Sequence, residues 1–240
     1  MGLNTFNANG TVFERIEISG CDKNYWVTTP NSLDAHNITI RDCTGDSSRA
    51  ENFYHEAGTK CTFDNIRLTN SGTKGFSATI FGATDSTQTT MINVTVDTCE
   101  RGFISIGSDN IFTNIRVYND TQTANESVQI NGNRNNGNFD IANVSGHGAR
   151  IYGHHNDIYT RGFNIGTHTD NTYDGVLVDG ATYCKVAGDF SGTNSNKMRY
   201  GINEINSADY NILGDAIGEN TGTATVHKTG THSVASANNI

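Results

Sequence analysis

One short segment of the chain gathers side chains that can move protons beside a sugar carboxylate. Within residues 150–161 the candidate catalytic residues are Arg150, Tyr152, His154, His155 and Asp157. A polysaccharide lyase acting on a uronic acid needs a cation at the carboxylate, a base for the adjacent proton and an acid for the leaving oxygen. The segment holds residue types for all three roles, and Glu126 from the preceding coil is a further candidate.

The roles divide according to the reaction. For elimination, Arg150 is the candidate cation, a histidine the base and Tyr152 the acid. Hydrolysis would instead use two carboxylates across the scissile bond, and Glu126 with Asp157 is the candidate pair. The alternative interpretation, which the sequence favours, is that these side chains are ordinary solvated corner residues.

Aromatic residues near the strands are candidates for stacking on sugar rings. We expect Tyr25, Tyr54 and Tyr152 to bind carbohydrate, whereas Trp26 and Phe53 are expected to fill the core. No Cys-x-x-Cys pair occurs, so we expect no metal site, and no motif calls for a cofactor.

A repeated unit of short strands must position these residues. An apolar-x-apolar strand, a corner and then Asn-apolar-x-apolar form one full copy at residues 103–117, and the second half recurs at 37–40, 65–68, 93–96 and 211–214. The period is about 25 residues, which is typical of a solenoid. Alternation of apolar and polar residues buries one face of each strand, and stacked coils bury that face together.

A coil of this length fits three short strands and three corners. The sequence therefore predicts an all-β chain: a single-stranded right-handed parallel β-helix with about nine coils, spanning residues 1–240 as one domain. Leucine-rich repeats have a similar period, but their Leu-x-x-Leu-x-Leu phrase is absent. Residues 1–12 show no amphipathic capping helix, so we expect either a longer parent protein or a partner covering that end.

The repeat also predicts which residues stack. Four asparagines precede apolar residues in consecutive coils and predict an internal ladder: Asn37, Asn65, Asn93 and Asn114. The residues after them are predicted to point inward and stack on one another: Ile38, Ile66, Val94 and Ile115. Three cysteines follow the closing apolar residue of a repeat and are predicted to share one interior position as free thiols: Cys21, Cys43 and Cys99.

Charge and hydropathy exclude some partners. The formal net charge of −9 argues against binding nucleic-acid phosphates. No apolar run is long enough to span a bilayer, and no amino-terminal signal is present, so we expect no membrane insertion.

The Asn-Ile-x-Ile/Val phrases and the closing stretch from Tyr210 to Ile240 resemble the pectin-lyase-like β-helix superfamily over nearly the whole chain. Within it, the chain is most similar to the β-helical regions of viral tail spikes and tail fibres. This resemblance implies a virion-tail or extracellular location, a homotrimer, and a host-surface polysaccharide or glycan as the ligand.

The enzyme motifs of that superfamily are incomplete here. Residues 146–148 read Gly-His-Gly, but no Asp-Asp pair precedes them and no Arg-x-Lys follows, so His147 is interpreted as a corner residue. We therefore favour a non-catalytic β-helical module of a tail spike or fibre, with a structural or carbohydrate-binding role. The alternatives are a lyase or glycoside hydrolase acting on an acidic polysaccharide, and a cell-surface adhesin.

Overall fold

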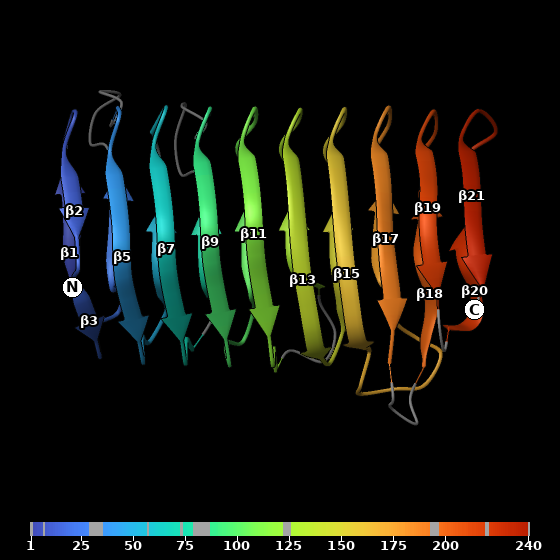
Figure 1. Ribbon diagram of the computed structural model, residues 1–240, viewed down its shortest axis with the longest axis horizontal. Coiled ribbons are helices and arrows are strands. Elements are labelled where there is room, and N and C mark those ends of the chain that lie inside the picture. Colours follow the sequence, from blue (N-terminus) through green and yellow to red (C-terminus); the bar gives the residue numbers. More distant parts are fainter. Residues whose placement is uncertain are drawn as a thin grey trace.

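The chain winds into a stack of strands that forms two parallel sheets (Figure 1). The computed structural model describes residues 2–6, 8–28, 36–56, 58–72, 74–78, 87–121, 126–192, 197–218 and 221–239. Within these residues there are 21 strands and no helix. The predicted fold class, a parallel β-helix, is confirmed.

One sheet is ten-stranded, with the order β1 (Leu3–Phe6), β4 (Tyr25–Thr28), β6 (Glu51–His55), β8 (Lys74–Ala78), β10 (Phe103–Ser105), β12 (Glu126–Ile130), β14 (His147–Ile151), β16 (Val176–Asp179), β18 (Met198–Ile205) and β20 (Thr221–His227). The other sheet is eleven-stranded, with the order β2 (Val12–Glu14), β5 (Thr39–Asp46), β7 (Thr62–Thr69), β9 (Thr90–Asp97), β11 (Ile111–Tyr118), β13 (Asn136–Val144), β15 (Asp157–Ile165), β17 (Lys185–Ser191), β19 (Ile212–Gly218) and β21 (Val234–Asn239), while β3 (Glu17–Ser19) also pairs with β5.

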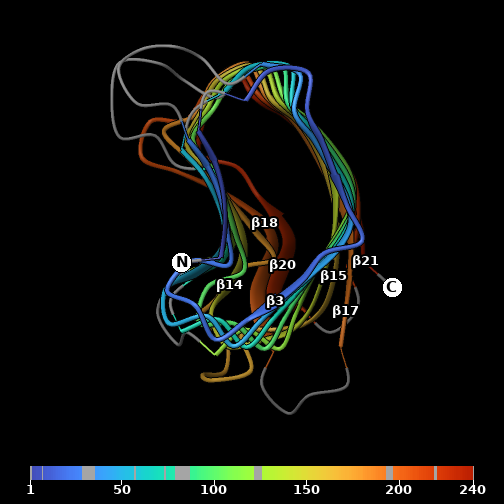
Figure 2. The ribbon, with the colours of Figure 1, turned by 90° about the vertical axis from the view of Figure 1, so that its left-hand side faces the viewer.

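From β4 onward, successive strands alternate between the two sheets. Each strand pairs with the strand one rung earlier and one rung later, so backbone hydrogen bonds run along the whole stack. Figure 2 looks along the stack and shows the two sheets facing each other across the core. The ten-stranded sheet curves toward the other sheet, so its outer face is concave.

The long strands of the eleven-stranded sheet bend at single residues with left-handed backbone. Asn65, Asn93 and Asn114 have φ values of 53°, 54° and 55°, a conformation that asparagine tolerates well. The predicted internal ladder of Asn37, Asn65, Asn93 and Asn114 is wrong, because none of these residues is buried. Asn114 Nδ2 donates to Asn93 Oδ1 at 2.7 Å, but Asn65 Nδ2 and Asn93 Nδ2 donate to aspartates, at 2.7 and 3.3 Å.

A different set of asparagines forms the internal ladder. The backbone N–H of Asn110 donates to Asn135 Oδ1 at 3.0 Å, and that of Asn135 donates to Asn156 Oδ1 at 2.8 Å. All three residues are buried. The interior ladder therefore satisfies backbone donors at a corner, where no strand partner is available.

The predicted column of apolar residues is correct in burial and partly wrong in register. Ile38, Ile66, Val94 and Ile115 are all buried. Ile66 pairs with Val94 on one side, but with Cys43 rather than Ile38 on the other. Thr39 pairs with Thr62, which places Ile38 beside Cys61. The phrase at residues 37–40 therefore sits in a different column from the phrases at 65–68 and 93–96.

The prediction that three cysteines share one interior position is also wrong. Cys43 lies within β5, whereas Cys21 lies just after the end of β3 and Cys99 just after the end of β9, so the three do not share one position. All five cysteines are free. Burial raises the pKa of the Cys61 thiol to about 11 and that of Cys99 to about 12.

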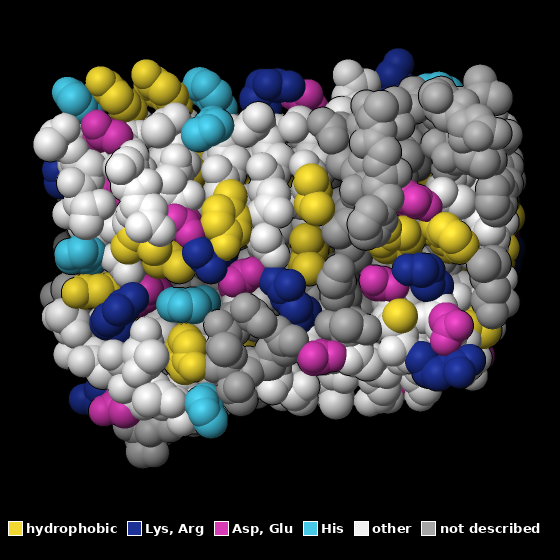
Figure 3. All heavy atoms as spheres, turned by 180° about the vertical axis from the view of Figure 1, so that it is seen from behind, with side chains coloured by type: hydrophobic (Ala, Val, Ile, Leu, Met, Phe, Trp, Pro, Cys, Tyr) yellow, Lys and Arg dark blue, Asp and Glu magenta, His cyan; other side chains and the backbone are white. Residues whose placement is uncertain are grey.

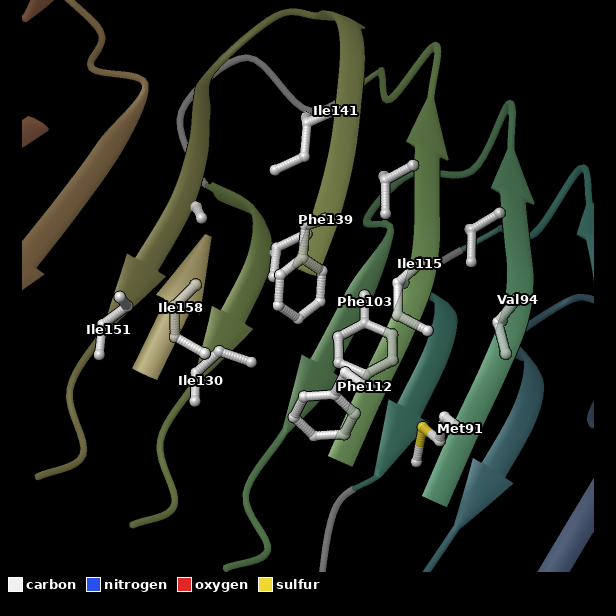
Figure 4. Close-up of a cluster of buried hydrophobic side chains, with 14 of the residues drawn as sticks. Met91, Val94, Phe103, Phe112, Ile115, Ile130, Phe139, Ile141, Ile151 and Ile158 are labelled. Carbon is white, nitrogen blue, oxygen red and sulfur yellow. The ribbon is translucent and has the colours of Figure 1, made fainter. Parts of the chain in front are cut away.

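Aromatic rings fill the middle of the core. The Phe103 ring meets those of Phe112 and Phe139 at centroid distances of 5.2 and 5.7 Å (Figure 4). Each buried phenylalanine contributes about 1.5–3 kcal/mol from apolar burial. Phe53 is in the core as predicted, and its ring packs against that of Tyr25 on β4. Trp26, the next residue on β4, points outward, so the prediction that Trp26 fills the core is wrong.

No helix long and apolar enough to cross a membrane occurs in the part of the chain that the structure describes.

Candidate functional site

The outer face of the ten-stranded sheet carries a band of charged side chains. Figure 3 views this face and shows basic, acidic and histidine side chains side by side across the strands. We call it the ionic face and define it by Arg101, Glu126, Arg150, Asp174, Asp179 and Arg199.

Four of these residues form one continuous chain of ion pairs across consecutive rungs. A terminal nitrogen of Arg101 lies 2.5 Å from Glu126, and a terminal nitrogen of Arg150 lies 3.7 Å from the other oxygen of Glu126. Arg150 Nε donates to Asp179 Oδ2 at 3.0 Å. These ion pairs are diagonal in the rung register, because Arg150 lies opposite Gln129 and Leu177 and its side chain reaches along the strands to the two carboxylates.

A second ionic group lies on the same face around Asp174, whose carboxylate is fully buried. Arg199 binds it with two nitrogens, at 2.9 and 2.7 Å, and Asn203 donates to it at 2.9 Å. Bidentate pairs of this kind hold both side chains in one orientation.

His147 connects the two groups, and the sequence interpretation missed it. It begins β14 and pairs with Glu126, so it belongs to the ionic face and not to a corner. Its Nδ1 accepts the backbone N–H of Asp174 at 3.0 Å, which leaves the proton on Nε2. Burial lowers the pKa of His147, so the ring is neutral at pH 7 and Nε2 is a donor. The Gly-His-Gly motif was the available signal.

Tyr152 follows β14 and packs under Arg150, whose guanidinium carbon lies 4.5 Å from the ring centroid. Burial raises the pKa of the Tyr152 hydroxyl, which therefore keeps its proton at neutral pH. The predicted outward direction of Arg150 and Tyr152 agrees with the structure, in which Ile151 between them is buried.

The structure does not bring the remaining candidate catalytic residues to this face. His154 is exposed at the next corner, where its Nδ1 accepts the backbone N–H of Thr182. His155 stacks on the Tyr183 ring at 5.1 Å. Asp157 begins β15 in the other sheet, so Glu126 and Asp157 do not face one bond as a hydrolytic pair.

Two of the three tyrosines that were predicted to bind carbohydrate are buried. Tyr25 is fully buried, and its hydroxyl lies within hydrogen-bond distance of two carbonyl acceptors, 2.6 Å from Ile16 O and 2.8 Å from Thr44 O. Tyr54 lies on the outer side, but it is only 3% exposed, and Lys23 Nζ lies 3.8 Å from its ring centroid. Tyr152 alone stands beside the ionic face.

The ionic face offers a general set of acid–base and hydrogen-bonding groups. Glu126 is a carboxylate acceptor held between two guanidinium groups, while His147 Nε2 and the Tyr152 hydroxyl are neutral donors. No group of three or more metal-binding side chains occurs among the residues that the structure describes.

No protein-family model and no curated protein sequence matches this chain. Among solved structures, the A-module of the mannuronan C-5 epimerase AlgE4 from Azotobacter vinelandii is similar, with a TM-score of 0.72 and 16% identity. That match covers 94% of this chain and 64% of the A-module. The AlgE6 A-module from the same organism gives a TM-score of 0.58 and 13% identity, over 100% of this chain and 91% of its own length. At these identities the likeness shows a shared β-helix fold.

Proposed function

We propose that this chain is a carbohydrate-binding β-helical module and that its ligand is a polysaccharide lying on the ionic face. The observation that carries the proposal is the unbroken chain from Arg101 through Glu126 and Arg150 to Asp179. It repeats donors and acceptors at the rung spacing of about 4.8 Å. A sugar chain carries hydroxyl groups that donate and accept hydrogen bonds at each residue.

The concave shape of the sheet supports the same assignment. A curved outer face surrounds an extended ligand better than a flat one, and concave sites are where ligands bury most surface (Figure 2). The cations of this face are already paired with carboxylates, so binding rests on hydrogen bonds in fixed directions rather than on net charge.

Calorimetry with a panel of polysaccharide oligomers tests the proposal. The panel contains mannuronan, polygalacturonate and neutral glucan hexamers, with Arg150→Ala and Asp179→Ala as the variants. Asp157→Ala is the matched control, because its carboxylate is exposed on the other sheet. We expect at least one hexamer to bind and both variants to lose that binding. A chain that binds no member of the panel refutes the proposal.

A second candidate function is an acid–base reaction on a uronate residue. Glu126, Arg150, Tyr152 and His147 together supply a base, a cation and two proton donors, and the two similar structures are mannuronan C-5 epimerases. Glu126 would remove the proton at C5 of the sugar, and Arg150 would stabilise the charge that develops on the carboxylate. Return of a proton from the opposite face gives epimerisation, whereas loss of the glycosidic oxygen gives elimination.

Incubation of mannuronan in D2O separates these outcomes. Epimerisation leaves deuterium at C5, elimination produces unsaturated ends that absorb in the ultraviolet, and hydrolysis produces new reducing ends. Any of these activities that disappears in Glu126→Gln supports the catalytic candidate. Unchanged polymer after prolonged incubation favours a binding module.

A role in a viral tail spike or fibre, as a homotrimer at the virion surface or in an extracellular location, stays a prediction from the sequence resemblance. Light scattering on the purified chain tests the trimer directly. A monomer would argue against the tail interpretation.

A further inference from the structure

The outer face of the eleven-stranded sheet carries a second cluster of aromatic and charged side chains. On β15, alternation along the strand turns Tyr159, Arg161 and Phe163 outward. Tyr159 is 37% exposed and Phe163 is 41% exposed. Large rings left in solvent in the middle of a sheet, rather than at its ends, indicate a surface that binds something.

Phe163 belongs to a row in which large and small side chains alternate. The strand register aligns Tyr118 on β11 with Ala142 on β13, and Ala142 with Phe163 on β15. Two rungs separate the rings, so their Cα atoms lie about 9.6 Å apart, with only the Ala142 methyl group between them. We call Tyr118, Ala142 and Phe163 the ring slot.

The ring slot has room for one six-membered ring. A ring placed over Ala142 would lie about 4.8 Å from each wall, within the separations at which rings pack against each other. The surface is hollowed at this point, and the hollow is lined by the ring slot together with the charged residues beside it.

The adjacent row supplies the polar edge. Asp140, Arg161 and Asp189 occupy one position on three consecutive rungs, and we call them the charged row. Arg161 holds both oxygens of Asp140, at 2.6 and 2.8 Å. The Tyr159 hydroxyl donates to Asp189 at 2.6 Å. The charged row also lines a neighbouring hollow, together with Asn138.

The positive and negative charges of this cluster balance each other, which limits the kind of ligand that the cluster can attract. Arg116 lies 4.0 Å from Asp140, so two guanidinium groups face two carboxylates. An anionic ligand such as a phosphate would find no net attraction here. A neutral sugar fits better, because its ring offers an apolar face to the aromatic walls and its hydroxyl groups both donate and accept hydrogen bonds.

We propose that the ring slot binds one pyranose ring of a neutral glycan and that the charged row bonds its hydroxyl groups. This site lies on the opposite sheet from the ionic face and uses none of its residues. It would hold a glycan whether or not the ionic face binds a polysaccharide.

The test uses the whole chain and three neutral hexasaccharides: cellohexaose, xylohexaose and mannohexaose. Calorimetry gives the affinity, and saturation-transfer NMR shows which sugar protons touch the protein. Ala142→Phe fills the slot without removing any residue, and Phe163→Ala removes one wall. Each change should weaken the binding of the best hexasaccharide about tenfold or more.

Two controls separate the slot from general effects. Ile111→Ala truncates another exposed side chain on the same sheet and should bind the hexasaccharide like the unmodified chain. Arg150→Ala disrupts the ionic face and shows whether the ligand lies there instead. The proposal is overturned if none of the three hexasaccharides binds at millimolar concentration, or if Ala142→Phe binds unchanged. Loss of binding in Arg150→Ala would assign the ligand to the ionic face. A mannuronan hexamer that binds more tightly than the neutral hexasaccharides and loses this binding in Ala142→Phe would overturn the ligand class.

Discussion

Arg150 Nε donates to Asp179 Oδ2 across one rung of the ten-stranded sheet, at 3.0 Å, although the partners are 29 positions apart in the chain. This pairing holds the guanidinium over the ring of Tyr152. Arg150 thus lies between Asp179 on the following rung and Glu126 on the preceding rung. The ionic face therefore draws its residues from several rungs rather than from one contiguous segment.

We expect Asp179→Asn to lower the free energy of unfolding by about 1–2 kcal/mol. Both oxygens of Asp179 accept hydrogen bonds, one from Arg150 and one from Asn206 at 2.7 Å. The amide group of asparagine keeps only one acceptor, so one donor loses its partner. Urea unfolding measures the change, and Asp157→Asn, at an exposed carboxylate, should leave it near zero. An equal loss in both variants would contradict this account.

Glu204 is a buried carboxylate that ties residues 229–233 to β18. Its oxygens accept from Asn211 Nδ2 at 2.8 Å, Thr229 N at 3.0 Å, Gly230 N at 2.6 Å and Ser233 Oγ at 2.6 Å. Glu204→Gln turns an amide NH2 toward two of these donors, and we expect it to cost about 3 kcal/mol of stability.

Thermal unfolding of Glu204→Gln measures that loss. Glu17→Gln is the matched control, because Glu17 is exposed on β3. A melting temperature for Glu204→Gln equal to that of the control would show that the four hydrogen bonds contribute little.

His55 should make the chain less stable in acid. The residue is fully buried, and neither ring nitrogen has a hydrogen-bond partner among the described residues. Burial lowers the pKa of His55 from 6.5 to about 3. Below pH 6.5 the unfolded chain takes up a proton that the folded chain refuses until about pH 3. The free energy of unfolding is therefore highest above pH 6.5 and decreases as the pH falls from 6.5 toward 3.

The difference between the unmodified chain and His55→Leu isolates this effect. The unfolding free energy of the unmodified chain should fall relative to the variant by about 1.4 kcal/mol per pH unit between pH 6 and pH 4. His168→Leu, at an exposed histidine, should leave the slope unchanged. Parallel pH profiles for the unmodified chain and His55→Leu would disprove the assignment.

The thiols should differ sharply in reactivity. Cys21 is partly exposed, whereas Cys43, Cys61, Cys99 and Cys184 are buried. Burial raises the pKa of Cys61, Cys99 and Cys184, which removes the reactive thiolate. The native chain should react with about one equivalent of an aromatic disulfide reagent. Cys21→Ser should abolish that reaction, and rapid modification of the folded Cys21→Ser variant would show that the coil opens locally.

Reductant should leave the melting temperature of the native chain unchanged, since all five thiols are free. A loss of several degrees would reveal a disulfide that contributes to stability.

The sequence predicted side-chain direction well wherever a strand had one clear inward residue. Ile151 is an example, and it correctly placed Arg150 and Tyr152 outside. The prediction failed at β4, where Tyr25 and Trp26 are adjacent and both large. A strand has a period of two, so a shift of one residue exchanged the core residue for the exposed one.

The sequence by itself determined the repeating unit, because alternating apolar residues at a period of about 25 can bury their inner face only by stacking. The tertiary structure decided the register between rungs, since corners of different length bring different columns together. Ile66 consequently lies beside Cys43, and Asn110 rather than Asn93 belongs to the interior ladder. The ionic face and the ring slot follow the same rule. Each joins side chains that are distant in the chain and come together only because parallel strands stack in rungs about 4.8 Å apart.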